Sequence, residues 1–111
     1  MISAAPPYTY RGRCVRVVDA STVDLLLDCG FHVYKQSRFR IKGIATPESK
    51  AEATMAHITF ILSGSALPWP LIVRSYKEPE QPGMWLADIF INGSGVNLGD
   101  ELIKLQMAEK R

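Results

Sequence analysis

The chain has 111 residues, of which 47% are hydrophobic and 22% are charged, and this composition is ordinary for one folded globular domain. A net charge of +2 is too small to indicate nucleic-acid binding by itself, so the distribution of charge matters more than its sum. No apolar run reaches the roughly 18 residues of a membrane-spanning helix, and the first residues lack the basic and apolar regions of a secretion signal. We therefore expect a cytoplasmic protein without a membrane partner.

The first part of the chain predicts a leader followed by a β-hairpin. Residues 1–10 are rich in proline and small side chains, which is typical of a flexible leader, and residues 11–111 are expected to form a single domain. The β-branched run 11–19 predicts a strand, and the strict alternation of apolar and polar residues over 23–29 predicts a second. Ala20 and Ser21 lie between them and predict a tight turn.

The two cysteines lie in this hairpin. Pairing about the turn would place Cys14 near Leu27, with Cys29 diagonal to Cys14 on the same face. A disulfide bridge between them is possible, but two small buried thiols are the preferred interpretation. The alternation that buries the leucines predicts that Asp24 and Asp28 face solvent.

Residues 33–44 predict a third strand with two unlike faces. One parity of this run is apolar and predicts a packed face. The other parity carries Arg38, Arg40 and Lys42, which predicts a positively charged face.

Apolar residues at roughly helical spacing follow Pro47 and predict a helix. Ser49 would cap this helix together with Glu52 in a capping box, and Gly64 would end it. The side chains expected on its apolar side are Ala53, Ala56, Ile58, Phe60 and Ile61.

The remaining sequence predicts two strands and a second helix. The strands are expected at 70–77 and 84–91, with residues 78–83 as the turn between them. The helix would start at Asn97 or Asp100, run for about ten residues and end near Lys110. The side chains expected on its apolar side are Leu102, Ile103, Leu105 and Met107.

The predicted order of elements is β-β-β-α-β-β-α. Five short strands with a helix between the third and the fourth are the arrangement of an OB-fold barrel. The fold class is therefore mainly β, an α+β protein built on a five-stranded OB-fold barrel with two helices.

Four segments resemble the staphylococcal nuclease (thermonuclease) family, in its order and near its spacing. Residues 15–25, VRVVDASTVDL, resemble its first hairpin with an Asp-Gly-Asp-Thr turn, and residues 38–48, RFRIKGIATPE, resemble its arginine strand ending in Asp-Thr-Pro-Glu. Residues 82–91, PGMWLADIFI, are similar to the strand that begins Tyr-Gly-Arg-Gly-Leu-Ala. Residues 95–110, GVNLGDELIKLQMAEK, are similar to the C-terminal Val-Asn and helix. The resemblance covers nearly the whole chain from Arg13.

The resemblance implies calcium-dependent phosphodiester cleavage, which needs metal-binding aspartates, a glutamate base and two arginines. The two principal metal aspartates fall on Ser21 and Ala45. Thr46 matches the threonine whose carbonyl meets the metal, and Asp19 matches the first aspartate of the turn. Because serine and alanine supply no carboxylate, we expect no calcium ion and no other cofactor.

The catalytic positions of the family are kept only in part. Arg40 matches the first arginine and Glu48 the general base, but the second arginine falls on Met84 and the tyrosine beside it on Pro82. We therefore expect Arg40 and Glu48 to be remnants in a protein that is no longer an enzyme. They could instead form a structural ion pair. With a rebuilt metal site they would give a residual phosphodiesterase. A cleavage assay with calcium, magnesium and manganese would reveal this activity, which should vanish in Glu48→Gln.

From these observations we expect a nuclease-like OB-fold module with a degenerate active site. It would bind single-stranded nucleic acid with little sequence preference. The side chains expected to bind are Arg38, Arg40, Lys42, Arg13 and Arg16, and the aromatic residues expected to stack on bases are Tyr8, Tyr10, Tyr34, Tyr76, Trp69 and Trp85. A solvated strand face is the plain alternative.

The other functional class that the sequence allows is a protein-interaction or assembly module. A cleft filled by Met84 and Trp85, which stands where the family has a glycine, would favour this alternative.

Overall fold

The computed structural model describes residues 8–63, 67–81 and 84–110. Most of the predicted leader, the helix stop at Gly64 and the Pro82–Gly83 part of the predicted turn lie outside these residues. Where the description starts, the first strand already begins at Thr9, earlier than the predicted Arg11.

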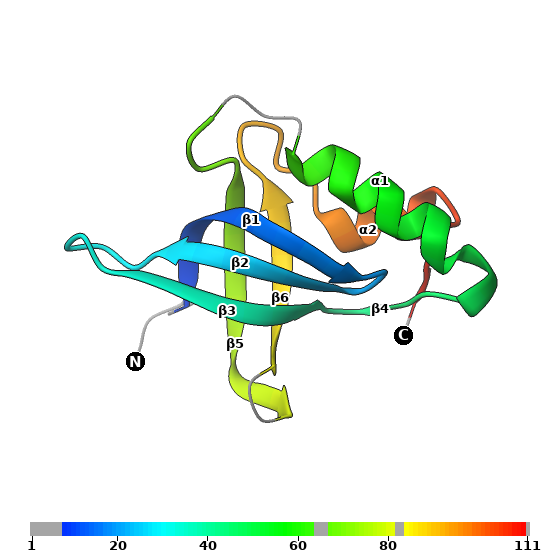
Figure 1. The fold of residues 1–111 in the computed structure, drawn as a ribbon, viewed down its shortest axis with the longest axis horizontal. Coiled ribbons are helices and arrows are strands. Elements are labelled where there is room, and N and C mark those ends of the chain that lie inside the picture. The colour runs from blue at the N-terminus through cyan, green and yellow to red at the C-terminus, as the bar shows by residue number, and fades with distance from the viewer. Residues whose placement is uncertain (1–7, 64–66, 82–83, 111) are drawn as a thin grey trace, which may run out of the picture.

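Five strands close into a barrel, which confirms the predicted order β-β-β-α-β-β-α (Figure 1). Their order around the barrel is β1-β2-β3-β6-β5, in which β3 and β6 run parallel and the other neighbours run antiparallel. The main elements are β1 (Thr9–Asp19), β2 (Thr22–Asp28), β3 (Tyr34–Ile41), α1 (Ala51–Ser63), β5 (Leu71–Gln81), β6 (Met84–Ile91) and α2 (Leu98–Lys104). Neither helix is long and apolar enough to cross a membrane.

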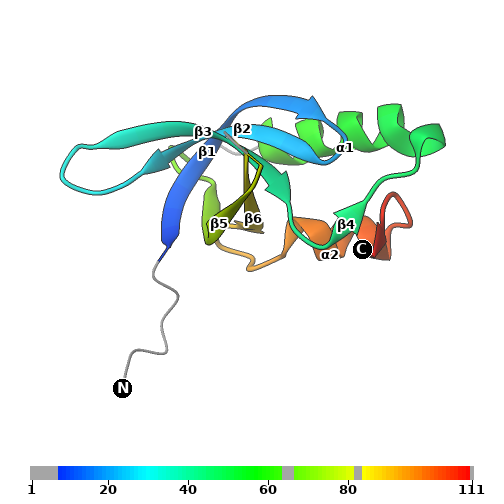
Figure 2. The same ribbon diagram turned by 90° about the horizontal axis from the view of Figure 1, so that it is seen from below.

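The third predicted strand is divided in two. After β3, Lys42 and Gly43 form a turn in which Gly43 has a φ of +84°, and a short strand β4 (Ile44–Ala45) follows. This strand pairs with β7 (Glu109–Lys110), so the segment ahead of α1 is joined to the end of the described chain (Figure 2).

The second helix is shorter than predicted. It ends at Lys104, because the chain turns back at Gln106, whose φ of +60° leaves the helical region, and then enters β7. Of the two predicted starts, Asn97 is correct: it precedes the helix and caps it, since its side chain accepts a hydrogen bond of 3.2 Å from the backbone N–H of Asp100. Leu105 is exposed, contrary to prediction.

The barrel core follows the period-two pattern of the strands. Side chains of alternate residues point inward, as predicted for β2 and for Phe39 and Ile41 of β3. Val33, predicted to share that packed face, is exposed because the strand begins only after it. The largest inward residues with almost no exposure include Leu25, Ile41, Leu71, Ile89, Val23 and Val73.

The buried face of α1 agrees with the prediction only in part: Ile58 is buried and Ile61 packs against the core as predicted. Its buried residues are Thr54, Ile58 and Leu62, spaced four apart, whereas Phe60 is exposed. The prediction missed Thr54 because its polar side chain does not belong to the apolar pattern. Its hydroxyl donates a hydrogen bond of 2.9 Å to the backbone carbonyl of Met107, which satisfies both groups away from water.

The start of this helix also differs from the predicted capping box. A 3₁₀ turn over Glu48–Lys50 leads directly into α1, so Ser49 lies within that turn instead of ahead of the helix. Pro47 precedes the turn and supplies no side-chain cap.

The end of β5 and the register of the first hairpin also differ from the prediction. The strand β5 continues through most of the predicted turn, as far as Gln81, where it still pairs with Met84. In the first hairpin, Cys14 pairs with Leu25 and not Leu27, because β1 has irregular register between Cys14 and Arg16 and again further on. Both cysteines are free thiols; Cys14 is half-buried, and Cys29 is exposed rather than buried as predicted.

Candidate nucleic-acid interface

The outward side chains of β1, β2 and β3 form one continuous charged surface, which we call the outer face. Strand alternation and the register between the three strands place their outward residues side by side. The register shift after Cys14 places Arg16 on the same side of β1 as Arg11 and Arg13, where it is paired with Asp24 of β2. The outer face comprises Arg11, Arg13, Arg16, Asp24, Asp28, Tyr34, Arg38 and Arg40.

Asp24 lies at the centre of the outer face, between arginines from both neighbouring strands. Arg38 Nε donates to Asp24 Oδ1 at 2.9 Å, and a terminal nitrogen of Arg16 lies 3.3 Å from Oδ2. The side chain of Asp24 is only 11% exposed, because the two arginines cover it, so the expectation that it faces open solvent is wrong. The hydrogen bond from Arg38 holds the pKa of Asp24 below its usual value.

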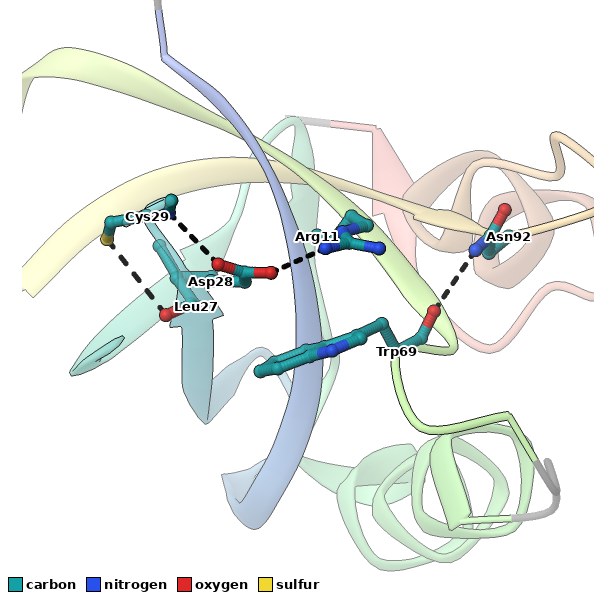
Figure 3. A network of polar contacts seen from close by, with 7 residues as sticks. Arg11, Leu27, Asp28, Cys29, Trp69 and Asn92 are labelled. Carbon is teal, nitrogen blue, oxygen red and sulfur yellow. Dashed lines mark hydrogen bonds and ion pairs between the residues drawn. The ribbon is translucent and has the colours of Figure 1, made fainter. Parts of the chain in front are cut away.

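Asp28 forms a second acidic position on the same face (Figure 3). One of its oxygens accepts a hydrogen bond of 2.9 Å from the backbone N–H of Gly30, and the other lies 2.6 Å from a guanidinium nitrogen of Arg11. These two contacts, the backbone one first, lower the pKa of Asp28. The carboxylates therefore hold arginine side chains in place and also cancel part of their charge.

Two aromatic rings lie at the edge of the outer face. Tyr34 of β3 and Trp69, in the segment ahead of β5, stack with ring centroids 5.8 Å apart and planes inclined by 6°. The Arg13 guanidinium lies over the Trp69 ring, 5.2 Å from its centroid. The backbone carbonyl of Trp69 accepts a hydrogen bond of 3.1 Å from the Asn92 side chain, which fixes this segment (Figure 3).

Lys42 occupies a different environment from the other predicted binding residues. It follows the last residue of β3, and its ammonium group lies 5.0 Å from the centroid of the Tyr76 ring of β5. The alternation over the predicted strand 33–44 placed Lys42 on the same face as Arg38 and Arg40. The strand ends at Ile41 instead, and Lys42 is directed across β6 toward β5.

The positions that match the nuclease metal site are brought together. The N–H of Ser21 donates to Asp19 Oδ1 at 2.9 Å, and the Ser21 carbonyl accepts from Ile41 N–H at 2.9 Å. The Thr46 hydroxyl donates to the carbonyl of Ala20 at 3.3 Å. The hairpin turn, the end of β3 and the segment just ahead of the 3₁₀ turn therefore meet.

These residues do not fit a calcium ion. Calcium is typically held by about six to eight oxygens with several carboxylates among them. Here Asp19 already accepts from Ser21, and Ala45 has no side-chain oxygen. Within the described residues, no three His, Cys, Asp or Glu side chains gather as a metal site. Glu48 is exposed in the 3₁₀ turn, and its ion pair with Arg40 stays a prediction.

Met84 and Trp85 begin the strand that is parallel to β3. Met84 lies beside Arg38 in the register, and Trp85 lies beside Phe39. Because Phe39 is an inward residue, Trp85 also faces the barrel interior, where it packs against the core. Trp85 therefore does not fill the region between Ser21 and Arg40, as a plugged cleft would require.

Tyr34 and Trp69 are the part of this surface that sequence patterns could not pair. They are far apart in the chain, and Trp69 lies between two prolines outside any regular element.

Comparison with known proteins adds no assignment to the residues of the outer face. No protein-family model and no curated protein matches the chain, so its similarity to the nuclease family remains an interpretation of the quoted motifs.

Proposed function

We propose that this chain is a non-catalytic barrel module that binds single-stranded nucleic acid on its outer face, with little dependence on base sequence. The observation that carries the proposal is the combination, on one sheet surface, of an arginine row with a stacked aromatic pair. Arginines contact phosphates, and exposed rings stack on bases of any kind.

The charge of the outer face supports binding to an anionic chain. Five arginines lie on it, and Asp24 and Asp28 offset only part of their charge. A guanidinium group has five N–H donors, and Arg38 uses only some of them for Asp24. The remaining donors are available to phosphate oxygens while the carboxylate holds the side chain in position.

The aromatic pair supports binding to unpaired bases rather than to a duplex. Half of the Tyr34 side chain is exposed although its ring is stacked on Trp69. Because every base presents a flat aromatic surface, such a platform does not require a particular base. Bases in a duplex are already stacked on one another, so this contact favours single strands.

The test is a titration with fluorescently labelled single-stranded DNA and RNA of mixed sequence at several salt concentrations. The logarithm of the affinity should fall with the logarithm of salt by about 0.7 for each phosphate neutralised. Trp69→Ala should weaken binding by about 1–3 kcal/mol through loss of stacking, and Arg13→Gln should reduce the salt slope by about 0.7.

Lys104→Gln provides the matched control. This exposed lysine lies on α2, which packs against β6 and β7 rather than the outer face. Its replacement removes one positive charge and should leave the slope unchanged. Equal effects of Arg13→Gln and Lys104→Gln would show that any binding reflects overall charge, and no binding at low salt would reject the proposal.

A protein-interaction module is the second candidate, and the tip of the β2–β3 hairpin favours it. Phe31 is 99% exposed there, and both Phe31 and His32 have left-handed backbone, with φ of 55° and 59°. Such conformations are costly for side chains other than glycine. Under this alternative, Phe31→Ser should abolish binding to a purified partner protein and leave the affinity for oligonucleotides unchanged.

A further inference from the structure

A cavity of about 340 Å³ opens at one end of the barrel, on the inner side of the strands that carry the outer face. It lies where β1 begins, β2 ends and β3 begins, and its walls come from the barrel strands and the residues directly adjoining them. Of the ten lining residues in the described part of the chain, five are aromatic: Tyr8, Tyr10, Phe39, Tyr76 and Trp85. We call it the barrel cavity.

Backbone hydrogen bonds hold the aromatic walls in place. The carbonyl of Tyr8 accepts a hydrogen bond of 2.8 Å from the N–H of Ser75, which attaches the start of the described chain to β5. Tyr10 is paired with β5 in the register, and Phe39 is paired with Trp85 across β3 and β6. A cavity built in this way is formed before a ligand arrives, which is typical of small-molecule sites.

The Tyr76 ring is held separately from these strand pairs. Its hydroxyl donates a hydrogen bond to the Asp88 carboxylate of β6. Burial and this contact raise the pKa of Tyr76, so the phenol stays neutral.

The charge of the lining side chains indicates which kind of ligand the barrel cavity would hold. Among the lining residues that the structure describes, Lys35 carries the one charged side chain, and it makes none of the ion pairs found in the described part of the chain. An ammonium group at the mouth of an aromatic cavity attracts an anion and repels a cation. Two hydroxyls, of Ser37 and Ser75, also line the cavity and offer hydrogen bonds to a polar ring edge.

We propose that the barrel cavity binds one nucleobase that carries a phosphate group, with the base between the aromatic walls and the phosphate at Lys35. The volume is near the lower limit of ligand sites, about 300–1,000 Å³, and so suits a single nucleotide rather than a longer ligand. This site is separate from the outer face, because its residues Tyr10, Leu27 and Phe39 alternate with the outer-face residues along β1, β2 and β3 and so lie on the opposite side of these strands.

Tryptophan fluorescence of the whole chain tests the site. In Trp69→Phe, Trp85 is the single tryptophan, so a change in emission reports the barrel cavity and not the outer face. Adenosine 5′-monophosphate should quench this emission, and adenosine without phosphate should bind about tenfold more weakly. Lys35→Gln should remove that difference while leaving adenosine binding unchanged, and its exposed position makes the exchange harmless to folding.

The two free thiols supply an independent measurement. Cys29 lines the barrel cavity and is exposed, whereas Cys14 is half-buried elsewhere and burial raises its pKa. Adenosine monophosphate should slow alkylation of Cys29 by iodoacetamide, measured by mass spectrometry of the peptides, and should leave Cys14 alkylation unchanged. Slowing at both cysteines would indicate a change in global stability and would overturn the assignment to this cavity.

Two sources of such a ligand are separated by comparing free nucleotide with oligonucleotides that do or do not carry a 5′-phosphate. Protection of Cys29 by the phosphorylated oligonucleotide alone assigns the cavity to strand ends, and protection by the free nucleotide alone assigns it to a soluble nucleotide. Equal binding of adenosine and its monophosphate would overturn the proposal, as would no quenching at millimolar nucleotide. Preferential binding of tetramethylammonium would also overturn it, because that result would identify a cation site.

Discussion

Replacing Asp24 by asparagine tests the electrostatic design of the outer face. The exchange keeps the shape of the side chain and removes the charge that lies between Arg16 and Arg38. Of the contacts it weakens, only the 2.9 Å bond from Arg38 Nε has good hydrogen-bond geometry. Arg38 and Arg16 remain 41% and 62% exposed, so water screens part of their attraction to Asp24.

The expected loss in the free energy of unfolding at pH 7 is about 1–2 kcal/mol. A hydrogen bond to a charged group contributes about 1.5–3 kcal/mol, and the exposure of the arginines reduces this toward the 0–1 kcal/mol of a surface ion pair. For a chain of this size the corresponding fall in melting temperature is roughly 5–10 °C. Urea unfolding followed by tryptophan fluorescence measures the difference.

The difference in the free energy of unfolding between the wild type and Asp24→Asn should shrink as the pH falls. The pKa of Asp24 is lower in the folded chain than in the unfolded chain, so its ionised form stabilises the fold above the unfolded value of about 3.9. This contribution is lost as the pH falls through the lowered native pKa, where the protonated wild-type side chain resembles asparagine. Equal stability of the two proteins at pH 7, or a difference that grows toward acid pH, would refute the reasoning.

The same exchange should act in the opposite direction on binding. Asp24→Asn would leave the arginines of the outer face without their central carboxylate, so the affinity for a single-stranded oligonucleotide at low salt should rise as stability falls. A parallel loss of stability and affinity would show instead that the placement of the arginines by Asp24 matters more than the charge it cancels.

Two further replacements test the packing of the barrel and of α1. Thr54→Val should lower the free energy of unfolding by about 1–2 kcal/mol, since it leaves the Met107 carbonyl without its 2.9 Å donor. The control is Thr59→Val at an exposed position, which should change the free energy of unfolding by no more than about 0.5 kcal/mol. Equal losses in the two variants would argue against the buried hydrogen bond. Gly12→Ala should cost about 1–2 kcal/mol, because the added methyl group would lie 3.1 Å from side-chain carbons of both Leu27 and Val73. Unchanged stability of the alanine variant would mean that the two neighbours move aside without strain.

The order of the strands was predictable because each carries a local pattern. Alternation in β2 and in the second half of β3 sets which side chains enter the core, and the parity seen in the sequence is the parity in the barrel. The interruption at Gly43 was not predictable, because it depends on β4 pairing with β7 near the other end of the chain. The place of Thr54 on the buried face of α1 was missed for a similar reason, since its hydroxyl is satisfied by the distant carbonyl of Met107.

The arginines of the candidate site were predictable as a group, but their partners were not. The pattern placed Asp24 on the side opposite to the core, which is correct, and from this predicted an open carboxylate. Its burial results from Arg16 and Arg38 on neighbouring strands, and this depends on a register shift in β1 that no residue type signals. Likewise, no local pattern links Trp69 to Arg13.

The closure of the barrel has a consequence for folding and aggregation. The strands β1, β2 and β3 follow one another through short turns, but the barrel closes only when β5 and β6, which come after α1, pair with β1 and β3. Such non-local pairing is slow compared with formation of a hairpin. Until it occurs, β1 and β3 are the open edges of a three-stranded sheet. Open edges pair readily with other chains unless charged side chains prevent it. Both strands are rich in arginine, so the positive charge also keeps partly folded copies of the chain apart.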